Sequence, residues 1–404
     1  MNNKLNSVAL RLSSLTVFRG ILDRREMAAF LHFLSCEGAL RERLSLYGEF
    51  VYSLAPYGNS FSEFLKKAVC EDENLYIVSK AKKKDIPASV EKNLKEELSL
   101  FTLLSELTPE ELFEGGVYEA YIPLFENEKT DFTAFYKERT DNVDTLGYGI
   151  FASKAMFKVE DGEIIPVDSA DEILLSSFVG YEKERETVEE NTVALLEGRD
   201  AVNVLLCGDA GTGKSSTVKA LVNHYFSYGL RLIEIRKDQL FSLSHIMGKI
   251  ADNPLKFIIF IDDLSFNKND DCFSMLKAAL EGSASAKAKN ALIYATSNRR
   301  HIVKESFSDR GGDDIHRNDT MQELLSLSDR FGLTVYFQKP NKILLRHRAV
   351  EVIALYGITF HAAQIFPFLL GLDTFGNDTQ LHPLCEADHG FQYNGSLAVL
   401  IQIV

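Results

Sequence analysis

The chain has 404 residues, of which 46% are hydrophobic and 25% charged, values typical of a globular protein with two or three domains of about 150 residues each. Its 44 Lys and Arg residues against 58 Asp and Glu residues leave a formal charge of −14. This charge argues against generic nucleic-acid binding by a basic surface but does not exclude a local basic groove. The five cysteines are scattered and form no CxxC pair, which predicts a cytoplasmic protein without a zinc site or a disulfide framework. The apolar runs are shorter than the roughly 18 residues of a membrane span, so we expect no membrane partner.

The first 170 residues are expected to form a mostly helical region. Apolar residues recur at helical spacing in 27–34, which is typical of a helix with one buried face. Thr108, Pro109 and Glu111 predict a helix start, because threonine can cap free amides, proline suits the first helical position and glutamate completes a capping box.

From residue 156 the pattern changes to strands. Two β-prone runs flank Asp161-Gly162, which predicts a hairpin that seals the joint between the helical region and the rest of the chain. A charged helix and five further strands separated by helical segments come next, the strands at 202–207, 231–235, 257–261, 291–295 and 333–337. Strands that alternate with helices form a parallel sheet covered on both faces. We therefore expect an α/β fold with a five-stranded parallel core over 171–340.

A glycine-rich string follows the first of these strands and opens a helix. It reads GDAGTGKS and is a complete GxxxxGK[ST] pattern in the order strand, loop, helix. In this pattern the backbone amides wrap phosphate oxygens, Lys214 reaches the β- and γ-phosphates, and the Ser215 hydroxyl binds Mg²⁺. The predicted phosphate-binding residues are Gly208, Asp209, Ala210, Gly211, Thr212, Gly213, Lys214, Ser215 and Ser216.

Two carboxylates end the apolar strand at 257–261. Asp262 and Asp263 should emerge at the carboxyl edge of the sheet, where the glycine-rich loop also opens. Asp262 then fits a residue on the magnesium side, and Asp263 fits the residue that polarises the attacking water. The alternative is a pair of carboxylates that only caps a helix.

Two further residues complete the predicted catalytic set. Asn298 ends the strand at 291–295 and would lie beside the γ-phosphate as a sensor, although a Thr-Ser-Asn strand end can also be a simple turn. Arg330 precedes the last strand, a place from which an arginine can neutralise charge on the γ-phosphate of a neighbouring subunit. The alternative for Arg330 is a surface salt bridge.

Taken in this order, the motifs resemble an AAA+ ATPase core. More narrowly, the strings GTGKSSTVKAL, KFIIFIDDLSF, LIYATSNRRHIVKE and LSLSDRFGL resemble the bacterial AAA+ family called domain of unknown function 815, over about 179–340. That family carries a mostly helical N-terminal region, with which residues 1 to about 170 are compatible.

The resemblance implies a role for each matching residue. It places ATP on the loop from Gly208 to Ser215, Mg²⁺ on Ser215 and Asp262, water activation on Asp263 and sensing on Asn298. Relatives usually carry glutamate in place of Asp263, and the shorter aspartate implies a different water position or slow hydrolysis. The resemblance also implies that Arg330 acts between subunits, in a homo-oligomer. The stretch that lines the adenine pocket in AAA+ proteins aligns with Val179, Gly180 and Tyr181.

The resemblance stops after the last strand. Relatives continue into a small helical lid that ends near a Ser-Gly-Arg or Ser-Pro-Arg string, which is lacking in 341–404. We interpret this atypical tail as a degraded lid or a frame-shifted end.

The leading hypothesis from the sequence is a Mg²⁺-dependent, ATP-hydrolysing AAA+ protein that couples its nucleotide state to conformational change or assembly. One alternative is a slow or non-hydrolysing, nucleotide-gated module that recruits an unknown protein partner. Another is a DNA-associated ATPase similar to a helicase loader, which the acidic composition disfavours.

Overall fold

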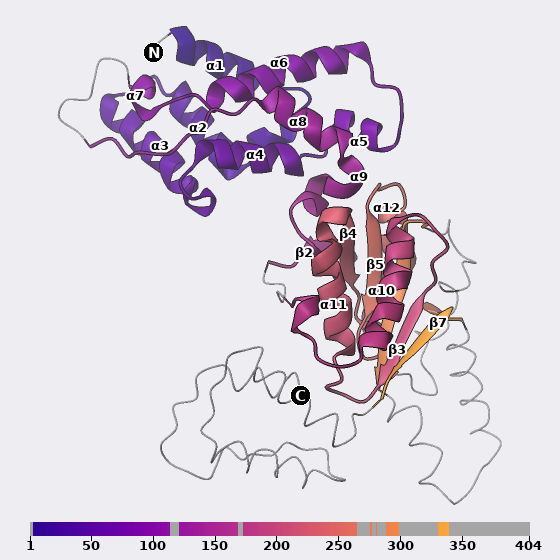
Figure 1. Cartoon of the computed structure of the whole chain (residues 1–404). Helices are drawn as coiled ribbons and strands as arrows, with labels where there is room; N and C mark the ends of the chain where they lie inside the picture. The colour runs from indigo at the N-terminus through magenta and orange to yellow at the C-terminus, as the bar shows by residue number, and fades with distance from the viewer. Residues whose placement is uncertain are drawn as a thin grey trace, which may run out of the picture. The chain divides into compact units, whose positions relative to one another are not determined.

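The computed structural model of the chain (Figure 1) describes residues 3–113, 121–168, 173–264, 275–276, 280, 288–298 and 330–338. The predicted tail over 341–404 lies outside these residues. The chain divides into two compact units, of which the first takes in Met1–Ala155 with Ser227–Gly229 and Asp252–Leu255. No helix in the described ranges combines the length and the apolar character that crossing a membrane requires.

The first unit is helical and has an aromatic core. Its α-helices are α1 (Asn3–Ser13), α2 (Arg25–Ser35), α3 (Leu40–Ser53), α4 (Phe61–Glu71), α5 (Leu75–Ala81), α6 (Ala88–Leu104), α7 (Pro109–Leu112), α8 (Phe132–Asp141) and α9 (Val143–Leu146). The buried rings of Phe30, Phe50 and Phe61 join α2, α3 and α4, with centroids 4.8 to 5.1 Å apart. The predicted capping box is confirmed, because Thr108 and Glu111 exchange hydrogen bonds at the start of α7.

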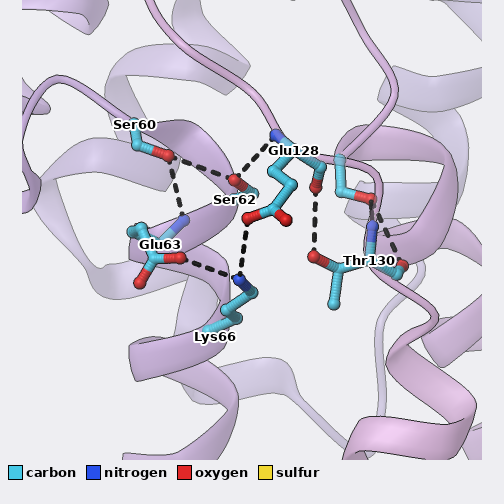
Figure 2. Close-up of polar contacts among 7 residues, drawn as sticks. Ser60, Ser62, Glu63, Lys66, Glu128 and Thr130 are labelled. Carbon is cyan, nitrogen blue, oxygen red and sulfur yellow. Dashed lines mark hydrogen bonds and ion pairs between the residues drawn. The ribbon is translucent and has the colours of Figure 1, made fainter.

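An extended segment before α8 is tied to the N-terminus of α4 by polar contacts (Figure 2). The Ser60 hydroxyl caps α4 by accepting a hydrogen bond from the Glu63 amide at 3.3 Å. The Glu128 amide donates to the Ser62 hydroxyl at 3.0 Å, and Lys66 forms ion pairs with Glu63 at 2.8 Å and with Glu128 at 3.6 Å. Both glutamates are exposed, so the cap and the amide bond contribute more to stability than the ion pairs do.

A buried carboxylate joins α6 to the segment that follows α1. Glu97 is 7% exposed, and its two oxygens accept hydrogen bonds from the backbone amides of Thr16, Val17 and Phe18 at 2.7 to 3.2 Å. Glu97→Ala would leave these amides without their acceptor, at a cost of about 2 to 3 kcal/mol of unfolding free energy. Urea unfolding followed by helical circular dichroism measures the loss. The neighbouring exposed Glu96→Ala is the control, and equal midpoints for both variants would contradict the assignment.

The second unit is built on a mixed sheet of seven strands. The strands are β1 (Met156–Glu160), β2 (Glu163–Pro166), β3 (Val204–Gly208), β4 (Leu230–Glu234), β5 (Lys256–Ile261), β6 (Ala291–Asn298) and β7 (Leu333–Phe337). They follow the order β2-β1-β4-β5-β6-β3-β7. The five predicted core strands, β3 to β7, are present, and their pairings are all parallel.

The prediction of a five-stranded sheet is wrong in number, because the hairpin joins the sheet. The hairpin itself is confirmed: β1 and β2 pair antiparallel around Asp161 and Gly162, whose φ angles of 49° and 80° suit a tight hairpin turn. β1 also pairs in parallel with β4, where it buries Phe157 and Val159 and covers what would be an exposed sheet edge. The two compact units accordingly divide before the hairpin, between residues 155 and 156, and not at the expected residue 170.

Helices pack against the sheet, and a ligand site can form at the edge where the parallel strands have their carboxyl ends. Helices α10 (Glu182–Leu196) and α11 (Lys214–Tyr225) contact each other, and α11 packs against β3, β4 and β6 (Figure 1). Residues 257–261 of β5 are all buried, as expected of a central strand covered on both faces. Strand β3 lies between β6 and β7; the chain re-enters the sheet at β4 after β3 and at β7 after β6. These opposite directions make the carboxyl end of β3 a switch point, where open α/β sheets bind ligands.

Candidate functional site

The glycine-rich loop joins the end of β3 to the start of α11. Gly211 and Gly213 have φ angles of 77° and 85°, in the left-handed region that glycine adopts without strain. Gly208 lies so close to β7 that a Cβ atom there would stand 2.2 Å from the Phe337 carbonyl oxygen. The glycines therefore serve both the turn of the loop and its close approach to the neighbouring strand, and α11 begins with its amides facing the loop.

Lys214, the first residue of α11, is folded over this loop. Its Nζ donates hydrogen bonds to the carbonyl oxygens of Gly208 at 2.9 Å and Asp209 at 2.7 Å. The side chain is buried, and burial lowers the pKa of Lys214 despite the opposing attraction of the Asp262 carboxylate. Both acceptors described for Nζ are neutral carbonyls, so an anion in the site would favour the charged ammonium.

Asp262 follows β5 and is held from three sides through one oxygen. Its Oδ1 accepts hydrogen bonds from the Ser215 hydroxyl at 2.7 Å, the Thr296 hydroxyl at 2.5 Å and the Asp263 amide at 3.1 Å. These donors come from α11, from β6 and from the turn after β5. The loop and the acidic strand end are thus connected directly, as their positions at one sheet edge predict.

Asp263 has an unusual backbone conformation and a side-chain partner. Its φ of 50° lies in the left-handed region, which aspartate tolerates better than most residues. The Asn298 Nδ2 donates to Asp263 Oδ1 at 3.0 Å, and the Asp263 amide donates to the Thr296 hydroxyl at 2.9 Å. The predicted water-activating carboxylate and the predicted sensor amide are therefore direct partners in this structure.

These side chains surround one cavity of about 260 Å³. It is lined by Ala210, Gly211, Gly213, Lys214, Ser215, Ser216, Asp262, Asp263, Thr296 and Asn298. All but Thr296 are among the predicted site residues. Of the remaining predicted loop residues, Gly208 and Asp209 accept from Lys214, and the Thr212 hydroxyl donates to the Asp209 carbonyl at 2.8 Å. They hold the loop that forms the cavity wall.

The predicted adenine-pocket stretch lies beside the loop, outside the lining of this cavity. The Tyr181 hydroxyl donates to the Gln338 carbonyl, and its ring lies 5.2 Å from that of Phe337. Gly180, like Tyr181, has a positive φ, and Val179 precedes it. The neighbouring Phe178 ring comes within 3.6 Å of the position that a Cβ on Gly213 would take, so the stretch borders the start of α11.

Sequence reasoning missed Thr296 and Phe178. Thr296 lies two residues before Asn298 on β6, and alternate residues of a strand share a face, so the strand period could have indicated it. Nothing in the spacing points to Phe178, whose place depends on the path of the chain before α10.

Arg330 is not brought to the cavity of its own chain. It precedes β7, whereas the cavity lies where β3, β5 and β6 end. Because these strands are parallel, Arg330 lies at the opposite edge of the sheet, about 16 Å away along the five residues of β7. The structure thus separates this residue from the other predicted catalytic side chains.

The chemistry of the donor groups fits a hard cation alongside an anionic ligand. Ser215 and Asp262 offer oxygen atoms, which Mg²⁺ prefers. No group of three or more His, Cys, Asp or Glu side chains that could hold a metal occurs within the described part of the chain. A magnesium ion here would therefore complete its coordination with phosphate oxygens and water, as is usual for sites with one or two carboxylates.

Comparison with known proteins returns one family. The family model described as "Protein of unknown function (DUF815)" matches residues 152–364, more than half of the chain. The match begins just before β1 and includes every described residue that lines the cavity. The search of curated proteins finds no match.

Proposed function

The chain belongs to the family described as protein of unknown function (DUF815), and we propose from its site that it binds ATP with Mg²⁺ and hydrolyses the ATP. We also propose that the second unit has the fold of a P-loop nucleoside triphosphatase of the AAA+ type. One observation carries it: a GxxxxGK[ST] loop that opens a helix faces two consecutive carboxylates across one cavity at a switch point.

The loop and the start of α11 supply the phosphate-binding groups. Residues 210–216 contribute backbone amides and the positive end of a 12-residue helix, both of which favour anionic oxygens. Lys214 adds an ammonium that is already buried at the loop. We expect its Nζ to exchange at least one carbonyl partner for phosphate oxygens, because the charged acceptor makes the stronger hydrogen bond.

Ser215 and the residues at the ends of β5 and β6 supply the groups for metal and water. Ser215 and Asp262 are joined by a 2.7 Å hydrogen bond and would hold Mg²⁺ beside the phosphates. When bound, the ion would neutralise part of the charge on the phosphate oxygens. Asp263 would accept a hydrogen bond from the attacking water and orient it in line with the γ-phosphate. Asn298 would move its amide from Asp263 toward the γ-phosphate, as expected of a sensor.

A second candidate function follows from the pairing of Asp263 with Asn298. The aspartate side chain is short, and one of its oxygens is already engaged at 3.0 Å. The site therefore also suits a nucleotide-gated module that binds ATP with little turnover and recruits a protein partner. Phosphate release from Mg²⁺·ATP by the purified full-length chain separates the two. Repeated turnovers at about 1 s⁻¹ or faster support the ATPase, and a single turnover or less supports the gated module.

From the position of Arg330 we also propose that the chain forms a homo-oligomer. At the sheet edge opposite its own cavity, it can complete a site only in a neighbouring copy, where a guanidinium would stabilise charge on the γ-phosphate. Lys214→Ala and Arg330→Ala should each be inactive alone. When they are mixed and allowed to assemble, intact cavities of one variant meet Arg330 of the other.

We expect this mixture to recover a substantial part of the wild-type rate of phosphate release. Dilution below the assembly concentration should remove the recovered activity, because the shared sites fall apart. A mixture as inactive as its components, in oligomers shown to be mixed by co-purification through an affinity tag on one variant, would contradict the role of Arg330.

A further inference from the structure

The end of β6 makes several hydrogen bonds to the turn that carries both carboxylates. The Leu264 amide donates to the Thr296 carbonyl at 2.7 Å, and the Ser297 hydroxyl donates to the Leu264 carbonyl at 2.9 Å. Asn298 contacts Asp263 from the same strand end. Three consecutive residues of β6 thus fix the backbone or the side chains of residues 262–264.

Among the described residues, only Thr296 has a hydroxyl that contacts both aspartates. Its Oγ1 lies 2.5 Å from Asp262 Oδ1 and accepts the Asp263 amide proton at 2.9 Å. A threonine hydroxyl has one proton, and ionised Asp262 can only accept, so that proton is donated to Asp262. The side chain is 2% exposed, which keeps water from replacing either bond.

The consequence for Asp262 is a fixed carboxylate orientation. Its Oδ1 takes three donors, namely Thr296, Ser215 and the Asp263 amide. Within the described part of the chain, no group donates to Oδ2, although Asp262 lines the cavity. For Asp263, the bond from its amide to Thr296 supports the left-handed φ of 50°, a conformation that must be held by its surroundings.

We propose that Thr296 is a positioning residue for the metal side of the site: its hydroxyl fixes the Asp262 carboxylate and the Asp263 turn so that Mg²⁺ can bind with the nucleotide. This inference rests on the proposed function. Groups that orient a metal-binding carboxylate by hydrogen bonds tune metal affinity without touching the metal themselves. Thr296 should therefore control the dependence of nucleotide binding on Mg²⁺ and leave metal-free binding by the loop unchanged.

Thr296→Val tests this, because valine keeps the shape and strand preference of threonine but has no hydroxyl. The readout is binding of a fluorescent ATP analogue by the full-length protein, titrated with Mg²⁺ and repeated in EDTA. We expect the Mg²⁺ concentration for half-maximal binding to rise about tenfold or more, with equal binding in EDTA. Thr296→Ser should restore the wild-type Mg²⁺ dependence. Thr296→Ala, which also lacks the hydroxyl, replaces the valine variant if the latter does not fold.

Ser297→Ala is the matched control. It removes a hydrogen bond to the same turn, but that bond touches neither carboxylate, so its Mg²⁺ dependence should stay that of the wild type. The positioning role would be overturned by a wild-type Mg²⁺ response in Thr296→Val, by an equal loss of its binding in EDTA, or by an equal defect in Ser297→Ala. None of these results would overturn the proposed function. No nucleotide binding by the wild-type protein, with or without Mg²⁺, would overturn the proposed function as well.

Discussion

Replacement of Lys214 with Met is expected to weaken binding of Mg²⁺·ATP by about 100-fold or more, equivalent to about 2.7 kcal/mol. Lys214 is the buried cation of the loop, and its Nζ lies between the carbonyl oxygens of Gly208 and Asp209. Methionine fills similar space but cannot donate to phosphate oxygens or offset their charge. Isothermal titration calorimetry on the full-length variant measures the loss.

The same substitution should change the stability of the nucleotide-free protein much less. Burial lowers the pKa of Lys214, so below that lowered pKa the charged side chain costs folding free energy, and this cost declines as pH rises from the lowered pKa to the ordinary pKa of lysine. Methionine removes this cost but also removes two hydrogen bonds, and these effects oppose each other. We expect thermal midpoints within a few degrees of each other, with the ATP-induced increase seen only in the wild type.

A matched control lies in the same helix. Lys219→Met makes the same change of charge at a position that does not line the cavity, and it should bind Mg²⁺·ATP like the wild type. Equal affinity for ATP in Lys214→Met and Lys219→Met would contradict the assignment of the loop as the phosphate site.

Replacement of Asp263 with Asn is expected to reduce phosphate release on the order of 100-fold while ATP affinity stays the same or increases. The carboxylate oxygen now paired with Asn298 at 3.0 Å is the group that we propose to orient water, and an amide is a far weaker acceptor of the water proton. Removal of one negative charge also lowers repulsion of the phosphates. Steady-state phosphate release together with calorimetric ATP affinity gives both quantities.

Asp238→Asn provides the comparison, because Asp238 is exposed and lies outside the cavity lining. Its turnover should equal that of the wild type. Rapid wild-type turnover that persists in Asp263→Asn would remove Asp263 from the mechanism. Little turnover in either protein, with ATP binding intact, would instead favour the nucleotide-gated module.

The parts of the structure that depend on local rules could be predicted from the sequence. The strand before the loop, the helix that opens at Lys214 and the hairpin around Asp161 all follow from glycine positions and apolar runs. Their signals lie within a few neighbouring residues. The grouping of Asp262 with the loop also follows, because parallel strands bring their carboxyl ends to one edge.

The sheet size and the fine contacts of the site could not be predicted in this way. Pairing of β1 with β4 joins residues more than 70 positions apart, and no local pattern records which strand a hairpin will join. The pairing of Asn298 with Asp263 and the double contact of Thr296 depend on the left-handed turn at Asp263. That turn is stabilised by a neighbouring strand, so the residues of the turn alone do not predict its conformation.

The cavity between the glycine-rich loop and Asp262 is the site that we propose binds ATP with Mg²⁺. Calorimetric titration of the purified full-length protein with ATP in Mg²⁺ tests it most directly. We expect one ATP per chain, with affinity that falls when EDTA removes Mg²⁺ and is about 100-fold or more weaker in Lys214→Met. Absence of binding at millimolar ATP, or binding that Lys214→Met leaves unchanged, would contradict it.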